Sequence, residues 1–123
     1  MGSPSPEKTA DLFIARFNSG DAPGFAQLYA EDAIFTYDGQ DKAVGRRQIE
    51  VAIAGFMTAG LKMRGSNVSV YVVGDTALTR FKWELVDGQG GVMGTGVSVE
   101  VQRRGEDGLW RFIIDDSGGG SRA

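Results

Sequence analysis

Residues 68–116 read VSVYVVGDTALTRFKWELVDGQGGVMGTGVSVEVQRRGEDGLWRFIIDD, and this stretch decides the fold. Runs rich in Val, Ile, Thr, Phe and Trp are separated by GD, DGQGG and GEDG, which have the composition of turns that need a positive φ. The pattern predicts four antiparallel strands joined by three hairpins.

Side chains alternate along a strand, so each predicted strand has two distinct faces. We expect the more apolar face of each strand to turn toward the core, which would leave Glu100 and Asp115 on the opposite face. On the last strand the apolar face ends in a carboxylate. The residues expected to face inward are Ala77, Thr79, Phe81, Trp83 and Leu85, then Val97, Val99 and Val101, and finally Trp110, Phe112, Ile114 and Asp116.

The residues before this stretch predict helices. Apolar side chains at helical spacing mark an amphipathic helix over 7–18, a short helix that Asp21 can cap and that closes near Ala30, and a third helix over 46–59. Residues 33–37 predict a short strand, and residues 38–45 a polar loop.

This order predicts an α+β fold with the helices on one face of the sheet, since only that face is large enough to bury three apolar helix stripes. We expect one domain over residues 7–117, a flexible leader over 1–6, and a flexible tail over 118–123 because GGGSRA has no apolar content to pack.

Composition excludes several classes of function. The chain has no His and no Cys, so catalysis by a Ser-His-Asp triad, a thiol nucleophile and His- or Cys-ligated metal sites are excluded. The net charge of −3 and the short basic pairs make nucleic acid an unfavourable partner. No apolar run is long enough to span a membrane, and we expect a cytoplasmic protein that needs no cofactor.

Several motifs resemble the nuclear transport factor 2-like superfamily, and most of all its small SnoaL-like, polyketide cyclase-like members. They are FNSGD at 17–21, LYAEDAIFTYDG at 28–39, VGRRQI at 44–49, GDTAL at 74–78 and RRGEDGLWRF at 103–112. The resemblance implies a curved, cone-shaped antiparallel sheet wrapped around the helices, a cystatin-like α+β barrel whose mouth holds a small apolar ligand. Relatives include ketosteroid isomerases, polyketide cyclases, dehydratases, epoxide hydrolases and a kinase association domain.

Two departures from the family pattern affect the site. Ile114 and Asp116 occupy the positions of a His-x-His pair that many relatives carry, and Tyr37 corresponds to the Asp base of the isomerases. The SnoaL-type cyclases use one buried Asp near the end of the sheet, and this resemblance assigns the acid–base role to Asp116 with Tyr37 beside it.

The residues predicted for the site also have purely structural interpretations. Asp116 could instead pair with Arg64 or Lys62, and the aromatic residues and Met57 could simply fill the core. The predicted ligand-binding residues are Trp83, Phe81, Phe35, Tyr29, Phe56, Met57, Phe112 and Ile114.

These observations predict an isomerase, cyclase or dehydratase that works on a hydrophobic polyketide-like or terpenoid molecule by carboxylate acid–base chemistry. A non-catalytic ligand-binding or association module is the alternative. We also expect a homodimer through the outer face of the sheet, because Leu78, Val86 and Ile113 place apolar groups where no helix can cover them.

Overall fold

The computed structural model describes residues 1–36 and 40–121. These residues form three helices and six strands. Their order is the one expected from the sequence, except that one short strand among the six was not predicted. Their bounds are α1 Thr9–Asn18, α2 Ala22–Ala26, β1 Tyr29–Thr36, β2 Lys42–Val44, α3 Arg46–Thr58, β3 Lys62–Val73, β4 Thr76–Val86, β5 Val92–Arg104 and β6 Trp110–Asp116.

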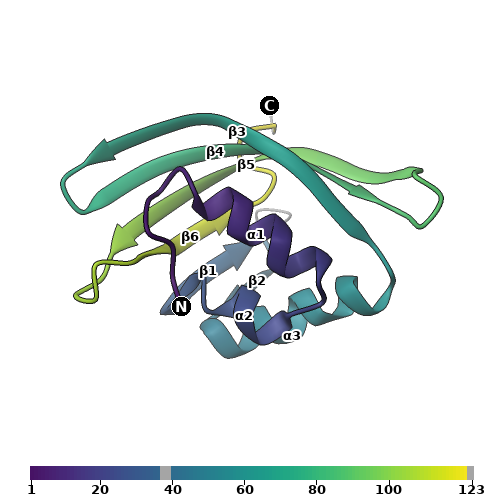
Figure 1. Ribbon diagram of the computed structural model, residues 1–123, viewed down its shortest axis with the longest axis horizontal. Helices are drawn as coiled ribbons and strands as arrows, with labels where there is room; N and C mark the ends of the chain where they lie inside the picture. The colour runs from purple at the N-terminus through teal and green to yellow at the C-terminus, as the bar shows by residue number, and fades with distance from the viewer. Residues whose placement is uncertain (37–39, 122–123) are drawn as a thin grey trace.

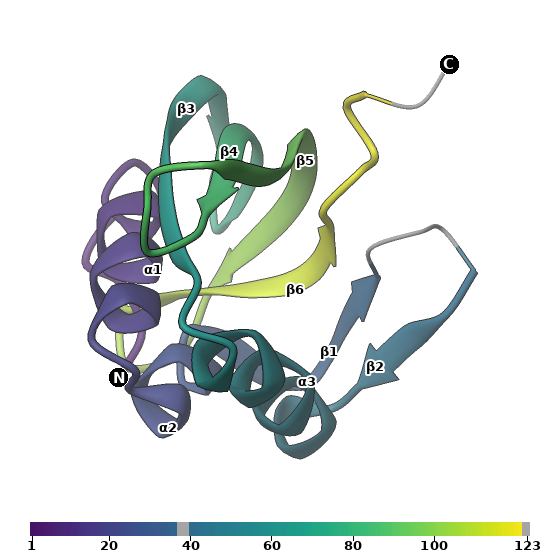
Figure 2. The ribbon, with the colours of Figure 1, turned by 90° about the vertical axis from the view of Figure 1, so that its right-hand side faces the viewer.

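All six strands form one sheet, in the order β2-β1-β6-β5-β4-β3. The antiparallel meander from β3 to β6 is confirmed. The sequence did not predict β2, which lies in the expected loop, or the parallel pairing of β1 with β6. The long strands arch over α1, and α2 and α3 lie beneath (Figure 1). The predicted α+β class with a curved sheet is confirmed, and the sheet stays open with β2 and β3 at its edges (Figure 2).

The core forms between the helices and the concave face of the sheet. Its centre is aromatic: Phe25 lies 4.5 Å from Phe13 and 5.8 Å from Tyr29 between ring centroids. The largest fully buried apolar side chains are Tyr29, Phe17, Phe25, Leu28 and Ile49. Asp21 caps α2 as expected, since its side chain accepts a hydrogen bond from the Gly24 amide.

Strand β5 turns the opposite face inward from the one predicted. Ser98, Glu100 and Gln102 are buried, and Val97, Val99 and Val101 lie on the outer face. The prediction rested on hydrophobicity alone, whereas the bulk of the side chains on the neighbouring strand determines which face of β5 turns inward.

The indole of Trp83 explains this choice of face. Gly65 and Gly96 are the cross-strand partners of Trp83 on its two sides. A Cβ at Gly96 would lie 2.8 Å from the indole, and one at Gly65 would lie 2.2 Å from the carbonyl oxygen of Lys82 and 2.6 Å from the ring of Phe81. A residue with a Cβ does not fit opposite the indole, so Gly96 lies on the inner face together with Trp83. Strict alternation along β5 then places Ser98 and Glu100 on the inner face as well.

Both chain ends that we expected to be flexible make contacts within the described residues. Ser3 exchanges two backbone hydrogen bonds with Trp110, at 2.9 and 2.7 Å, and is fully buried. The amide of Gly120 donates to the carbonyl of Val97 at 2.8 Å. Backbone hydrogen bonds to β5 and β6 hold these two segments against the sheet, although they have little apolar surface to bury.

Candidate functional site

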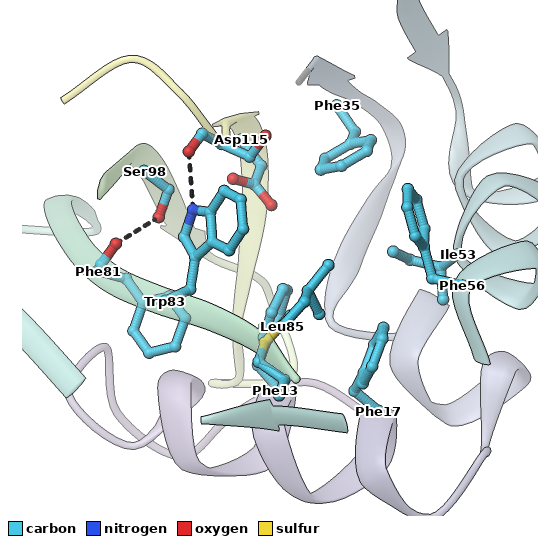
Figure 3. A pocket seen from close by; sticks show the side chains of 12 residues that line it. Phe13, Phe17, Phe35, Ile53, Phe56, Phe81, Trp83, Leu85, Ser98 and Asp115 are labelled. Carbon is cyan, nitrogen blue, oxygen red and sulfur yellow. Dashed lines mark hydrogen bonds between the residues drawn. The ribbon is translucent and has the colours of Figure 1, made fainter. Parts of the chain in front are cut away.

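A cavity of about 150 Å³ lies between the helices and the concave face of the sheet. Phe35, Ile53 and Phe56 face Trp83 and Asp115 across it (Figure 3). Phe56 is 38% exposed and so lies at the mouth, where the pocket opens to solvent. The lining consists of Phe13, Phe17, Phe35, Ile53, Phe56, Met63, Phe81, Trp83, Leu85, Ser98, Asp115 and Ser117.

Trp83 is held in place at the sheet side of this pocket. Its Nε1 donates a hydrogen bond of 2.8 Å to the carbonyl of Ser117, which follows β6 (Figure 3). Gly96 leaves room for the ring on the β5 side, since a Cβ there would lie 2.8 Å from the indole. Because the polar edge of the indole is satisfied by protein, its apolar surface is available to the pocket.

Among residues 1–36 and 40–121, Asp115 is the one ionisable side chain in the pocket lining. It is 3% exposed, and its Oδ2 accepts a hydrogen bond of 2.5 Å from the hydroxyl of Tyr29. Burial, and after it the charge of Glu100, raises the pKa of Asp115 well above its ordinary value. Burial and the neighbouring Asp115 also raise the pKa of Tyr29, which keeps that phenol neutral and able to donate.

The predicted register of β6 is wrong beyond Phe112. Gln102 pairs with Phe112 and Val101 with Ile114, so Ile113 is an extra residue in β6. Such a β-bulge shifts every following side chain to the other face. Asp115 therefore joins Phe112 on the inner face.

Asp116 and Ile114 consequently do not face the pocket. Ile114 is 44% exposed on the outer face, and neither residue is among those that line the cavity. Strict alternation along β6 would have placed both residues in the interior, as predicted from the sequence. A bulge leaves no signature in the alternating hydrophobicity of IIDD, so the sequence offered no means of choosing between the two aspartates.

The other predicted site residues divide into three groups. Trp83, Phe81, Phe35 and Phe56 line the pocket, although a ligand-binding role for them remains a prediction. Tyr29, Phe112 and Met57 stand behind the lining, where they belong to the core or pack against it. Tyr37 lies outside the described residues.

Eight residues of the lining were not among the predicted site residues: Phe13, Phe17, Ile53, Met63, Leu85, Ser98, Asp115 and Ser117. Phe13 and Phe17 were assigned to the helix stripe alone, and Ser98 was expected to face outward, as was Asp115. The alternation of Gly94, Gly96 and Ser98 beside the bulky strand β4 is the signal that could have shown the inner face of β5.

Two kinds of feature are absent from the described part of the chain. Over residues 1–36 and 40–121, no cluster of three or more Asp or Glu side chains is arranged to hold a metal ion. No helix within the same ranges has the length and apolar content to cross a membrane.

Comparison with solved structures shows what this architecture is similar to. An NTF2-like protein with a cystatin-like fold from Novosphingobium aromaticivorans superposes with a TM-score of 0.78 at 24% identity, over 89% of this chain and 76% of the other. A putative calcium/calmodulin-dependent protein kinase type II association domain from Thiobacillus denitrificans gives 0.79 at 16% identity, over 96% and 97%. A ketosteroid isomerase-like protein from Erwinia carotovora atroseptica gives 0.67 at 20% identity, over 87% of each chain. At these identities the likeness establishes the fold.

No curated protein matches the sequence. The SnoaL-like domain family matches residues 10–113, which include every helix and nearly all of the sheet. With the open, curved sheet, the helices on its concave face and the apolar pocket between them, this match shows that the chain belongs to the SnoaL-like domain family.

Proposed function

We propose that this protein binds a small, largely apolar molecule in the pocket and that Asp115 exchanges a proton with it, as an isomerase, cyclase or dehydratase without a cofactor. SnoaL-like domains in general bind small molecules or act as isomerases. The observation that carries the proposal is the buried carboxyl of Asp115, which has no other ionisable group beside it among the described residues of a largely apolar lining. Such a site favours proton transfer because burial raises the pKa of this carboxyl well above its ordinary value.

The raised pKa of Asp115 favours its neutral, protonated form. The Tyr29 hydroxyl donates to Oδ2, which leaves Oδ1 for the proton that is exchanged. Asp115 gives this proton to a ligand oxygen and becomes a carboxylate, and the Tyr29 hydrogen bond stabilises the charge. The proton lost by the ligand carbon in the same reaction returns to the carboxylate, so the protein is unchanged after one turnover.

The size of the cavity limits the part of the ligand that enters it. An apolar cavity of about 150 Å³ holds a molecule the size of benzene. We infer that one ring of a polyketide-like or terpenoid molecule, carrying a carbonyl or hydroxyl oxygen, enters between Phe35 and Trp83, and that the rest of the molecule remains at the mouth beside Phe56.

Binding can be tested with the fluorescence of Trp83. Single-ring ketones and phenols should change its emission and raise the melting temperature, because they bind the folded state only. Trp110, the second tryptophan, lies outside the pocket lining, so Trp83→Phe should abolish the emission change. A panel in which no compound moves either signal would contradict the existence of a ligand site.

Turnover separates the enzyme from a passive binding protein. For a compound that is both bound and converted, Asp115→Asn should lower turnover about a hundredfold or more, as expected for loss of a general acid. Asp116→Asn is the matched control, since it makes the same change at the next residue, whose side chain does not line the pocket. Turnover of this variant should stay within a few fold of the wild-type value. Binding without turnover in any compound would favour the alternative, a ligand-binding module.

We further propose a homodimer through the outer face of the sheet. An apolar row crosses all six strands there, since each of its members is the register partner of the next. It consists of Tyr71, Leu78, Val101, Ile114, Ile34 and Val44. Four of these are at least 43% exposed, which is unusual for large apolar side chains aligned in one row.

We expect Leu78→Glu to convert this dimer into a monomer, because a two-fold interface would bury the new charge on both subunits at once. Sedimentation equilibrium at micromolar concentration gives the mass. Val51→Glu is the control, since Val51 is 72% exposed but lies on α3, and its variant should sediment like the wild type. A wild-type monomer would end the proposal.

A further inference from the structure

Glu100 is a second buried carboxyl, directly opposite Asp115. The two residues are Cα partners in the antiparallel pairing of β5 with β6, and both face the interior. Direct partners in such a pair have Cβ atoms about 5 Å apart. Glu100 is 5% exposed and Asp115 3%, so both carboxyls are shielded from bulk water.

No cation balances this pair within residues 1–36 and 40–121. The ion pairs found there join Arg64 to Glu84, Arg104 to Asp75 and Arg111 to Asp107. α1, α3, β3 and β4 turn only apolar side chains toward Asp115 in the pocket. The titratable groups that act on Asp115 are Glu100 on β5, Tyr29 on β1 and its neighbour Asp116.

A chain of hydrogen bonds ends on Glu100 and points its donors toward it. Thr9 donates to the Gln102 Oε1 at 2.7 Å, and Gln102 Nε2 donates to the Thr79 Oγ1 at 3.3 Å. Because the Thr79 oxygen accepts from Gln102, its own proton goes to Glu100 Oε1, at 2.6 Å. The hydroxyl of Ser98 has two acceptors in reach, the carbonyl of Phe81 at 3.2 Å and Glu100 Oε2, and the contact with Oε2 is the shorter. Glu100 thus receives two hydroxyl donors, whereas Asp115 receives one.

This difference decides which carboxyl carries the charge. Two carboxylates that face each other in an apolar interior cannot both ionise. Burial raises the pKa of Glu100, but the hydroxyls of Ser98 and Thr79 act in the opposite direction. The pKa of Asp115 is raised by burial and again by the charge of Glu100. The negative charge therefore belongs to Glu100.

Glu100 also has a cavity of its own, away from the ligand pocket. This cavity has a volume of about 10 Å³, near the minimum for one water molecule, and Glu100, Gln102 and Asn67 supply its polar lining. Phe13 and Phe81 line both cavities and so form the wall between them. Glu100 can therefore be hydrated without any opening of the apolar pocket.

We propose that Glu100 and Asp115 hold one proton between them, with the charge on Glu100 and the proton on Asp115, and that Glu100 is the positioning residue that keeps Asp115 in its acid form. Use of this proton in a reaction rests on the function proposed above. The distribution of the proton between Glu100 and Asp115 is independent of that function, because it is a property of the ligand-free protein.

The test is a titration of the ligand-free protein labelled with ¹³C in the side-chain carboxyl groups, followed by NMR. Glu100→Gln removes the charge and keeps the shape, so at a given pH the ratio of ionised to protonated Asp115 should rise about tenfold, the coupling expected for an interacting pair. Glu84→Gln is the matched control, the same change at an outward-facing glutamate of β4, and should leave the ratio within twofold. An Asp115 titration that is the same in both variants overturns the proposal.

Thr79→Val provides a second test in case Glu100→Gln does not fold. It removes one donor from Glu100, so at neutral pH the Glu100 signal should move toward the protonated form and the Asp115 signal toward the ionised form. A residue that only fills space would produce no such exchange, and two unmoved signals would again overturn the proposal. If both titrations behave as expected while Asp115→Asn leaves turnover intact, the proposed function alone fails.

Discussion

The wild-type protein should lose stability as the pH rises from about 4 toward neutrality, and Asp115→Asn should lose less. The folded-state pKa of Asp115 is raised, so folding favours the protonated form. Its stabilising contribution is fully present below the unfolded pKa, about 3.9, and is lost as the pH rises through the folded pKa. Between these two values one carboxyl reduces the free energy of unfolding by about 1.4 kcal/mol per pH unit.

Urea denaturation at several pH values between 4 and 8 measures this slope. Asp115→Asn removes the titrating group and retains its shape, so its curve should be flatter than that of the wild type, and the double variant with Glu100→Gln flatter still. Parallel curves for the wild type and Asp115→Asn would show that Asp115 is ionised in the folded protein.

The pH range of this experiment matters because Asp107 acts in the opposite direction. Its hydrogen bonds with the Arg111 side chain, and next with the Leu109 amide, lower the pKa of Asp107 to about 2. A lowered pKa gives stability that is present above the unfolded value and is lost as the pH falls through the folded one. The contribution of Asp107 is therefore constant above pH 5, and it does not oppose the change expected from Asp115 in that range.

Phe25→Ala should lower the free energy of unfolding by about 3–5 kcal/mol, the range for removing a fully buried Phe ring. Phe25 is 0% exposed and packs against Phe13, Phe17 and Tyr29. Since α2 is one short turn, it cannot shift to fill the cavity without releasing the α2–α3 contact. Tyr29, which donates its hydrogen bond to Asp115, would lose the ring that packs against it. The titration of Asp115 should therefore also change in this variant.

Phe56→Ala is the matched control for this loss of stability. The same atoms are removed, but Phe56 is 38% exposed at the mouth of the pocket and has less contact with the core. Its cost should stay below about 2 kcal/mol. Urea midpoints at a single pH compare the two variants, and equal costs would mean that the aromatic centre around Phe25 is not the core of the domain.

The features that the sequence determined are those set by local chemistry. Residues at helical spacing gave α1 and α3 to within two residues at their ends, and the turn residues of GD, DGQGG and GEDG located the hairpins of β3 to β6. Gly74, Gly90 and Gly108 have a positive φ in these turns, the conformation for which glycine is suited. The α+β class followed, because the helix stripes and one sheet face have no other apolar partner.

The identity of the site carboxyl was decided by tertiary structure. Asp115 and Asp116 are the same residue type in the same strand, and only the bulge at Ile113 determines which of them faces the pocket. The bulge depends on pairing with β5, and the parallel neighbour β1 is separated from β6 by most of the chain. Strand alternation is a local rule, whereas register is set between strands.

The inward face of β5 has the same kind of cause. Its valines are the more apolar set, but the indole of Trp83 needs glycine opposite it, and this steric requirement comes from β4. Burial of Glu100 became tolerable because Thr79, also on β4, and Ser98 donate to it. The sequence therefore determined the elements and their order, while the contacts between strands decided which side chains meet in the pocket, because hydrophobicity along one strand carries no information about the bulk and hydrogen bonds of the next.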